Sequence, residues 1–277
     1  MIRVITCAQG GPEWHQARCG VITASMFSTV RKLVNGLTDQ QAKYVDAILS
    51  GKETKEAKQI AGYKAAPSSE TVARALKGEK VGEYSDAAKD YAFRLACERI
   101  SGKPLDEGFS TYQMRRGNEL EPEARDLHES RIGMLIERAG FVVTEDGKFG
   151  ASADGLIDDD GGSEYKCLLA PERIRSILFD GDLSEFMDQV QGCMWLTGRN
   201  WWHFCLYCPD LAPANKELII HRVERDDDYI EEMESDLVEF DRMVEQYRER
   251  ILEQPAEVWA PSSQTHEDQP EAELNIF

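Results

Sequence analysis

The sequence has no apolar run long enough to cross a bilayer. Its first residues, MIRVITCAQGGPEWHQ, also lack the apolar core and small-residue cleavage site of a secretory signal. A membrane-spanning helix needs about 20 apolar residues in a row, and a signal peptide needs both missing features. We therefore expect a soluble protein in the cytoplasm of the cell that makes it.

Regularly paired cysteines are also missing, because the seven cysteines are odd in number and scattered. That pattern indicates reduced thiols in a chain of this size. Cys205 and Cys208 have the spacing of metal ligands, but no second pair completes a four-thiolate site. Since they lie in the strand-like run WWHFCLYC, we favour buried thiols over a zinc or iron–sulfur site.

Basic residues are scarce, with 32 Lys and Arg against 51 Asp and Glu and a net charge of −19. Taken alone, this balance argues against a nucleic-acid partner, because phosphate binders usually carry a basic field. The acids, however, concentrate in residues 224–273, and metal-dependent nucleases also gather carboxylates. DNA contacts must then rest on local clusters around Arg18, Arg31 and Arg115, although each of these is individually also explained as a solvated surface charge.

What the sequence does contain is a predicted β-hairpin at FGASADGLIDDDGGSEYKC, residues 149–167. Asp154 falls on the first strand, and Glu164 and Lys166 share one face of the second because strand side chains alternate. The turn residues 158–162 place the turn centre near position 160. With that centre, Asp154 lies across from Lys166 and diagonal to Glu164.

Two carboxylates and an amine on one sheet face are costly unless a divalent cation compensates them. In a two-metal phosphodiesterase site, Asp154 would lie between two Mg²⁺ ions, for which Mn²⁺ would substitute. Glu164, with the carbonyl of Tyr165, would hold the ion that carries the attacking water, and Lys166 would position or deprotonate that water. The alternative is an ordinary hairpin with a surface salt bridge.

Two helical segments supply further candidates. In RRGNELEPEARDLHE, Glu121 follows a glycine at helical spacing and is predicted to point toward the hairpin. In DQVQGCMW, Gln189 and Gln191 lie in an otherwise apolar helix, where buried amides need partners such as a metal-bound water or a DNA phosphate. The alternatives are a solvated glutamate and ordinary hydrogen bonds to the backbone.

Hydrophobic periodicity predicts the remaining elements around these segments. A helix over 84–102 precedes a second helix that is interrupted or begins near Gly117, and a long amphipathic helix covers 229–252. Between them we expect strands over 137–144, 149–157 and 163–169, a helix over 185–198, and strands in WWHFCLYCP and KELIIHRVE.

The ordered segments EWHQARCGVITAS, GNELEPEAR, GASADGLI, EYKC and QVQGCMWLTGRNWW together resemble phage lambda exonuclease and its relatives, the YqaJ-type viral recombinase family. The resemblance implies an α/β, restriction-endonuclease-like PD-(D/E)XK core with a central mixed β-sheet flanked by helices. It also implies a Mg²⁺-dependent exonuclease that degrades the 5′-ended strand of linear duplex DNA and releases mononucleotides, encoded by a phage or prophage and acting in a bacterial host.

Carried over residue by residue, the resemblance makes Asp154, Glu164 and Lys166 the catalytic acid–acid–lysine set, supported by Glu121 and Gln189. Arg18 and Ser25 match positions that bind the 5′-phosphate, and Ser152 and Gln191 are further candidate DNA contacts. The family also implies a trimeric ring around DNA and a single-strand annealing protein as partner. Two positions depart from the family pattern: Ala153 replaces the proline of SPDG, and Leu168 stands where proline is common.

Residues 36–82 are predicted to form an all-helical insertion of three short helices, which divides an exonuclease core made of 1–35 and 83–253. LTDQQAKYVDAILSGKETKEAKQIAGYK resembles the helix-turn-helix of phage terminase small subunits. The insertion would contact duplex DNA or dock a partner, or would simply decorate the core. Residues 254–277 are acidic and proline-containing, which predicts a flexible tail.

Two alternatives to the exonuclease remain open. The first is an endonuclease of the same fold. The second is a DNA-binding or packaging adaptor protein that uses the helix-turn-helix.

Overall fold

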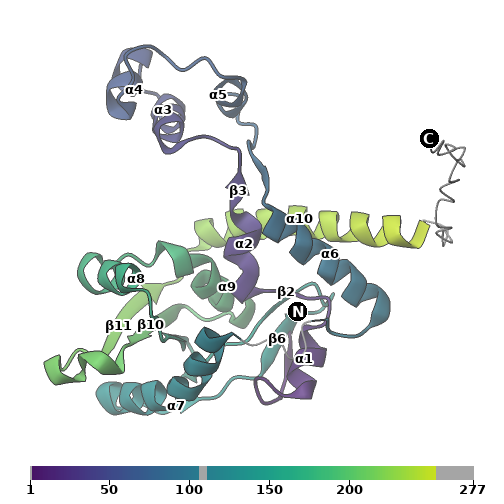
Figure 1. Ribbon diagram of the computed structural model, residues 1–277, viewed down its shortest axis with the longest axis vertical. Helices are drawn as coiled ribbons and strands as arrows, with labels where there is room; N and C mark the ends of the chain where they lie inside the picture. The colour runs from purple at the N-terminus through teal and green to yellow at the C-terminus, as the bar shows by residue number, and fades with distance from the viewer. Residues whose placement is uncertain (1, 106–110, 254–277) are drawn as a thin grey trace, which may run out of the picture.

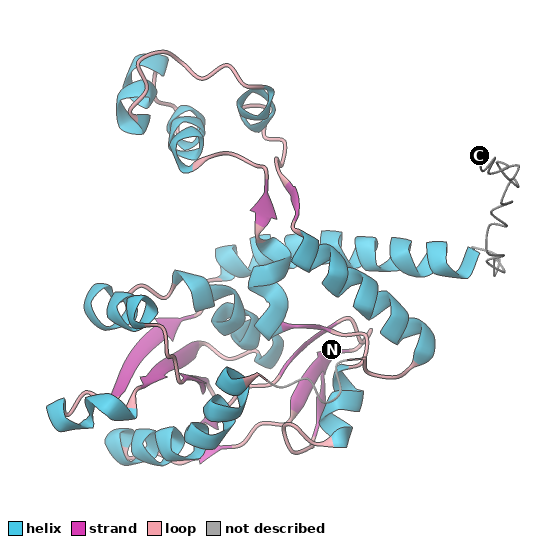
Figure 2. Cartoon of the chain, in the orientation of Figure 1, coloured by secondary structure: helices cyan, strands magenta, loops and turns pink. Residues whose placement is uncertain are grey.

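The computed structural model describes residues 2–105 and 111–253, and it is an α/β fold in which helices surround two main sheets (Figures 1 and 2). The helices are α1 (Pro12–Arg18), α2 (Phe27–Arg31), α3 (Asp39–Leu49), α4 (Thr54–Ala61), α5 (Glu70–Ala75), α6 (Asp86–Ser101), α7 (Tyr112–Ile132), α8 (Pro171–Arg175), α9 (Met187–Thr197) and α10 (Asp227–Glu253). The strands are β1 (Ile2–Ile5), β2 (Ile22–Thr23), β3 (Leu33–Val34), β4 (Glu83–Tyr84), β5 (Ile136–Glu137), β6 (Phe141–Thr144), β7 (Phe149–Ala151), β8 (Gly155–Ile157), β9 (Gly161–Lys166), β10 (Trp201–Tyr207) and β11 (Leu218–Glu224).

The larger sheet confirms the predicted mixed topology. Its order is β11-β10-β9-β8-β5, and only β9 and β10 pair in parallel. Trp202, Phe204 and Leu206 alternate along β10 and are fully buried. They belong to a core cluster that also contains residues of α6, α9 and α10. This packing holds β9, the strand with Glu164 and Lys166, between two neighbours and against a helical layer.

Gly161 and Gly162 were predicted as turn residues, and that prediction is wrong, because both lie in β9. A Cβ on Gly161 would lie 2.1 Å from the Trp201 ring, and one on Gly162 would lie 2.2 Å from the Trp202 ring. The two glycines therefore serve the close approach of two indole rings from the neighbouring strand. The hairpin turn itself consists of residues 158–160.

The predicted single strand 149–157 is divided between two sheets. β7 belongs to a four-stranded sheet of order β1-β6-β7-β2, whereas β8 belongs to the larger sheet. The break falls at 152–154, where the Ala153 carbonyl accepts a hydrogen bond from the Gln9 side chain at 2.8 Å. The predicted strand 137–144 is divided in the same way into β5 and β6.

Residues 36–82 contain the three predicted helices, which are α3, α4 and α5. Side chains from all three form a separate apolar cluster that includes Tyr44, Ala57 and Val72. The short antiparallel pair β3–β4 connects this bundle to the core, and Figure 1 shows the bundle extending away from the two large sheets. Lys80 contacts Asp236 of α10 at 2.8 Å at the base of the connection.

Two of the longer predicted helices differ from the structure at their ends. α7 is not interrupted at Gly117 but begins at Tyr112, after the N-cap Thr111, and continues through Pro122. α10 extends the predicted 229–252 helix by a residue or two at each end. The predicted flexible tail, residues 254–277, lies outside the described residues. Among the described helices, none combines the length and the apolar character that crossing a membrane requires.

Candidate active site

Asp154 lies immediately before β8, and its partner differs from the prediction. Gly155 pairs with Ser163 and Leu156 with Gly162. Extending this register by one residue sets Asp154 beside Glu164 and not across from Lys166, because the turn centre is at residue 159. The Tyr165 backbone N–H donates to Asp154 Oδ2 at 2.8 Å, which fixes the carboxylate against β9.

Glu164 and Lys166 share one face of β9, as the alternation predicted, and Gln189 of α9 joins them. Lys166 Nζ donates to Glu164 Oε1 at 2.7 Å and to Gln189 Oε1 at 2.9 Å. Gln189 Nε2 donates to the same Glu164 oxygen at 2.6 Å. The structure thus closes a three-membered hydrogen-bond ring of acid, amine and amide.

Gln191 does not reach this cluster. Its Nε2 donates to the Glu224 carbonyl at 2.9 Å, and its Oε1 accepts the Asp226 backbone N–H at 3.1 Å. The side chain is buried and joins α9 to the connection between β11 and α10. For Gln191 the backbone alternative is the one observed, since both ends of the amide are satisfied within the fold.

Glu121 points toward the hairpin from α7, but its direct partner is Arg125, a residue that sequence reasoning missed. Arg125 Nη2 donates both to Glu121 Oε1 and to the Asp154 carbonyl, the latter at 2.7 Å. Arg125 is 6% exposed. An arginine one helical turn after a candidate glutamate was the signal available in the sequence.

The negative charges of Asp154, Glu164 and Glu121 are only partly balanced by nearby positive charges. Burial raises the pKa of Asp154 well above its usual range, and the negative charges of Glu164 and Glu121 add to that rise. Burial also raises the pKa of Glu121, although Arg125 opposes the shift. Burial alone would lower the pKa of Lys166, but Glu164 and Asp154 outweigh it and raise that pKa, so the amine stays protonated.

The residues present fit a hard divalent cation. Glu164 Oε2 is buried and has no hydrogen-bond partner, although buried polar atoms rarely lack one. Within the described residues, no group of three or more Asp, Glu, His or Cys side chains is arranged to hold a metal ion. Mg²⁺ usually binds through only one or two carboxylates, with water and substrate phosphates completing its shell. Asp154 and Glu164 match such a set, since the Tyr165 N–H fixes Asp154 against the strand that carries Glu164.

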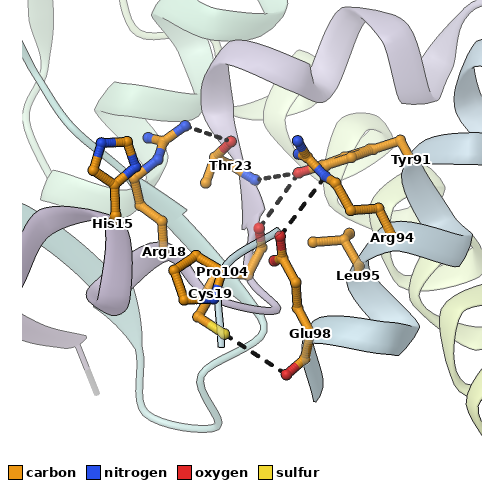
Figure 3. A pocket seen from close by; sticks show the side chains of 10 residues that line it. His15, Arg18, Cys19, Thr23, Tyr91, Arg94, Leu95, Glu98 and Pro104 are labelled. Carbon is orange, nitrogen blue, oxygen red and sulfur yellow. Dashed lines mark hydrogen bonds and ion pairs between the residues drawn. The ribbon is translucent and has the colours of Figure 1, made fainter. Parts of the chain in front are cut away.

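Arg18 and Thr23 line a pocket between α1 and α6 that Figure 3 shows from close by. Ser25 does not line it but lies next to Thr23. Arg18 Nη2 contacts Thr23 Oγ1 at 3.3 Å, and Thr23 Oγ1 lies 3.4 Å from Ser25 Oγ. Thr23 thus connects the two predicted phosphate ligands, a role that the sequence alone did not suggest. Arg94 also lines the pocket, so two guanidinium groups face one small space.

The buried carboxylate of Glu98 fixes the backbone around that pocket. Glu98 is 3% exposed, and its carboxylate accepts the Gly20 N–H at 2.8 Å and the Leu105 N–H at 3.0 Å. It therefore joins the turn after α1 to α6 and to the segment that follows α6. This fixes the backbone that leads into Thr23 and Ser25.

The mixed sheet flanked by helices has the exonuclease fold, with Asp154, Glu164 and Lys166 gathered at β9 and Gln189 on the covering helix α9. The sequence profile of the YqaJ-like viral recombinase domain matches residues 13–200. The chain belongs to this family, whose nucleases act in recombination.

Solved structures agree with this assignment. The chain is similar to the alkaline exonuclease LHK-Exo of Laribacter hongkongensis, with 26% identity, a TM-score of 0.61, and coverage of 87% of this chain and 96% of the other. It is similar to the same enzyme in complex with dAMP, with 27% identity, a TM-score of 0.62 and the same coverage. No curated protein matches the chain.

Proposed function

We propose that this protein is a Mg²⁺-dependent 5′-to-3′ exonuclease that resects linear duplex DNA for single-strand-annealing recombination and releases 5′-mononucleotides. The observation that carries the proposal is the Glu164 carboxylate, which Lys166 and Gln189 hold through one oxygen while the other is buried without a partner. Family membership and the dAMP complex of the similar Laribacter enzyme support the nuclease class and the mononucleotide product.

In this proposal Asp154 and Glu164, with the Tyr165 carbonyl, hold the metal. When bound, two Mg²⁺ ions supply Lewis-acid activation of water and neutralise charge on the phosphate. The protonated Lys166 orients the water or a phosphate oxygen, and Gln189 keeps both Lys166 and Glu164 in place. Arg125 holds the Asp154 backbone, so that carboxylate is oriented from both sides.

We assign recognition of the 5′-phosphate to Arg18 and Thr23, which line the pocket, and to Ser25 beside Thr23. A guanidinium offers a forked donor to a phosphate, and hydroxyl groups add neutral donors. The family resemblance also supports a trimeric ring around DNA and a single-strand annealing protein as partner, in the cytoplasm of a bacterium that carries the phage or prophage. We include both assemblies in the proposal.

Digestion of end-labelled duplex DNA tests the proposal and separates it from an endonuclease of the same fold. Linear duplex with a 5′ label should release labelled mononucleotide from the first turnover in Mg²⁺, and closed circular duplex should survive. Chelation with EDTA should stop the reaction, and adding Mn²⁺ should restore it. Linearised circles would instead establish the endonuclease, and release of the 3′ label first would reverse the proposed direction.

We also propose that the helical insertion makes an additional contact with duplex DNA. Residues 36–82 carry eight Lys or Arg against six Asp or Glu, whereas the whole chain has a net charge of −19. Lys43, Lys55 and Lys64 are exposed on this bundle. A positive module on an acidic nuclease fits a polyanion, since local basic charge drives non-specific DNA binding.

The β3–β4 pair that connects the helical insertion to the core allows residues 36–82 to be deleted without changing the core. Val34 and Glu83 are paired residues of β3 and β4, and Asn35 already has a positive φ of 57°. Replacing residues 36–82 with one glycine therefore leaves an Asn-Gly turn that suits a two-residue hairpin. We expect the deleted protein to keep its initial cleavage rate at saturating DNA but to bind duplex about 3- to 10-fold more weakly, and to dissociate sooner. Unchanged affinity and processivity would end the DNA-contact proposal.

A further inference from the structure

We propose that Trp14 is a positioning residue that connects the Arg18 pocket to the catalytic loop, residues 152–154, which contains Asp154. This inference rests on the proposed exonuclease function and adds a residue to it. Trp14 lies in α1, four residues before Arg18, and thus on the same side of the helix. Its indole contacts Arg18, which is proposed to bind the 5′-phosphate, and Ser152 in the loop that contains Asp154. The reaction requires a fixed distance between the bound phosphate and Asp154.

The first contact is with the pocket. The Arg18 guanidinium carbon lies 4.1 Å from the centre of the Trp14 ring, which is the geometry of a cation–π interaction. Arg18 Nη2 reaches Thr23 Oγ1 from that position. The ring therefore supports the arginine from one side while Nη2 contacts Thr23.

The second contact is with the catalytic loop. Trp14 Nε1 donates to Ser152 Oγ at 2.7 Å. β7 ends at Ala151 and β8 begins at Gly155, so Ser152 and Asp154 share a three-residue connection between two sheets. Gln9 holds the Ala153 carbonyl in the same connection. A shift of Ser152 must therefore displace Asp154, because a three-residue connection between two strands has little conformational freedom.

Through these two contacts Trp14 acts as a spacer, a residue that fixes the distance between the Arg18 pocket and the loop that contains Asp154. One face of the indole fixes Arg18, and its edge fixes the loop that ends in Asp154. The distance between the bound 5′-phosphate and the bond to be cut is thereby set by one rigid ring. A small misplacement of reacting groups is enough to slow an enzyme substantially.

Kinetics on two kinds of end separate the two contacts. Trp14→Phe keeps a ring under Arg18 but removes the Nε1 donor, so KM for 5′-phosphorylated duplex should change little while kcat falls about tenfold. Ser152→Ala removes the same hydrogen bond from the other side. On 5′-hydroxyl duplex, where no phosphate contact is made, both substitutions should lower kcat by the same factor, and the double variant should fall no further.

Trp201→Phe is the matched control, because the Arg222 guanidinium carbon of β11 lies 4.3 Å from the centre of the Trp201 ring of β10, a comparable arginine–indole pair. It should leave kcat on both substrates within about twofold. Wild-type kcat in Trp14→Phe, or additive losses in the double variant, would overturn the proposal. If Trp14→Phe does not fold, Ser152→Ala decides alone, and an unchanged kcat on 5′-hydroxyl ends overturns it.

Failure of the spacer is distinguishable from failure of the proposed function. If the wild-type protein digests linear duplex with Mg²⁺ but Trp14→Phe behaves like wild type, only the spacer is wrong. If the wild-type protein does not hydrolyse linear duplex at all, the exonuclease proposal itself fails.

Discussion

Asp154→Asn should reduce Mg²⁺-dependent hydrolysis of linear duplex DNA by on the order of a thousandfold or more. The substitution keeps the size of the side chain and an oxygen that can accept the Tyr165 N–H, but it removes the negative charge that a cation requires. Initial rates at saturating DNA and Mg²⁺ measure the effect. DNA affinity in Ca²⁺ should stay within a few-fold, since the substrate contacts are elsewhere.

The same substitution should stabilise the metal-free protein. Burial and two neighbouring acids raise the pKa of Asp154 above its unfolded value, so the folded state disfavours the ionised carboxylate. Stability linked to this group is full below the unfolded pKa and is lost as pH rises through the folded pKa. In EDTA, Asp154→Asn should therefore melt above wild type at pH 8, and the difference should shrink toward pH 4.

Asp236→Asn is the control of opposite sign. Burial alone would raise the pKa of Asp236, but Lys80 and Arg31 outweigh it and lower that pKa. Its stabilising charge is therefore present at neutral pH and is lost as pH falls through the folded pKa. Asp236→Asn should melt below wild type at pH 8. A metal-free Asp154→Asn protein that also melts below wild type at pH 8 would contradict the electrostatic account of the site.

The sequence placed Glu164 and Lys166 on one face because alternation along a strand is a local property. It misplaced Asp154 because the register depends on where the turn is centred. Gly161 and Gly162 look like turn residues until the rings of Trp201 and Trp202, about 40 positions away, are seen to occupy the space of their missing side chains. Such a contact between distant segments leaves no periodic signal.

Gln189 and Gln191 show the same limit on a helix. Two residues apart, they point about 200° from each other, so only one can face the hairpin. Both lie in an apolar run, and the pattern alone does not say which side α9 turns toward β9. Arg125 and Trp14 were missed for a related reason, because their partners Asp154 and Ser152 lie in a loop whose path was predicted as continuous strand.

Divalent cations should stabilise the wild-type protein by a large margin. A ligand that binds only the folded state at 100 times its Kd adds about 2.7 kcal/mol to the free energy of unfolding. For a chain of this size, that corresponds to a rise of about 5–10 °C in the midpoint of thermal unfolding. The buried Glu164 oxygen without a partner and the raised pKa of Asp154 are the groups that such binding would satisfy.

Thermal unfolding with and without Mn²⁺, compared between wild type and Glu164→Gln, tests most directly whether these carboxylates hold a metal. The wild-type midpoint should rise with Mn²⁺ concentration and saturate, whereas the midpoint of Glu164→Gln should not move. Equal shifts in the two proteins, or no shift in wild type, would contradict the assignment of the metal to Asp154 and Glu164.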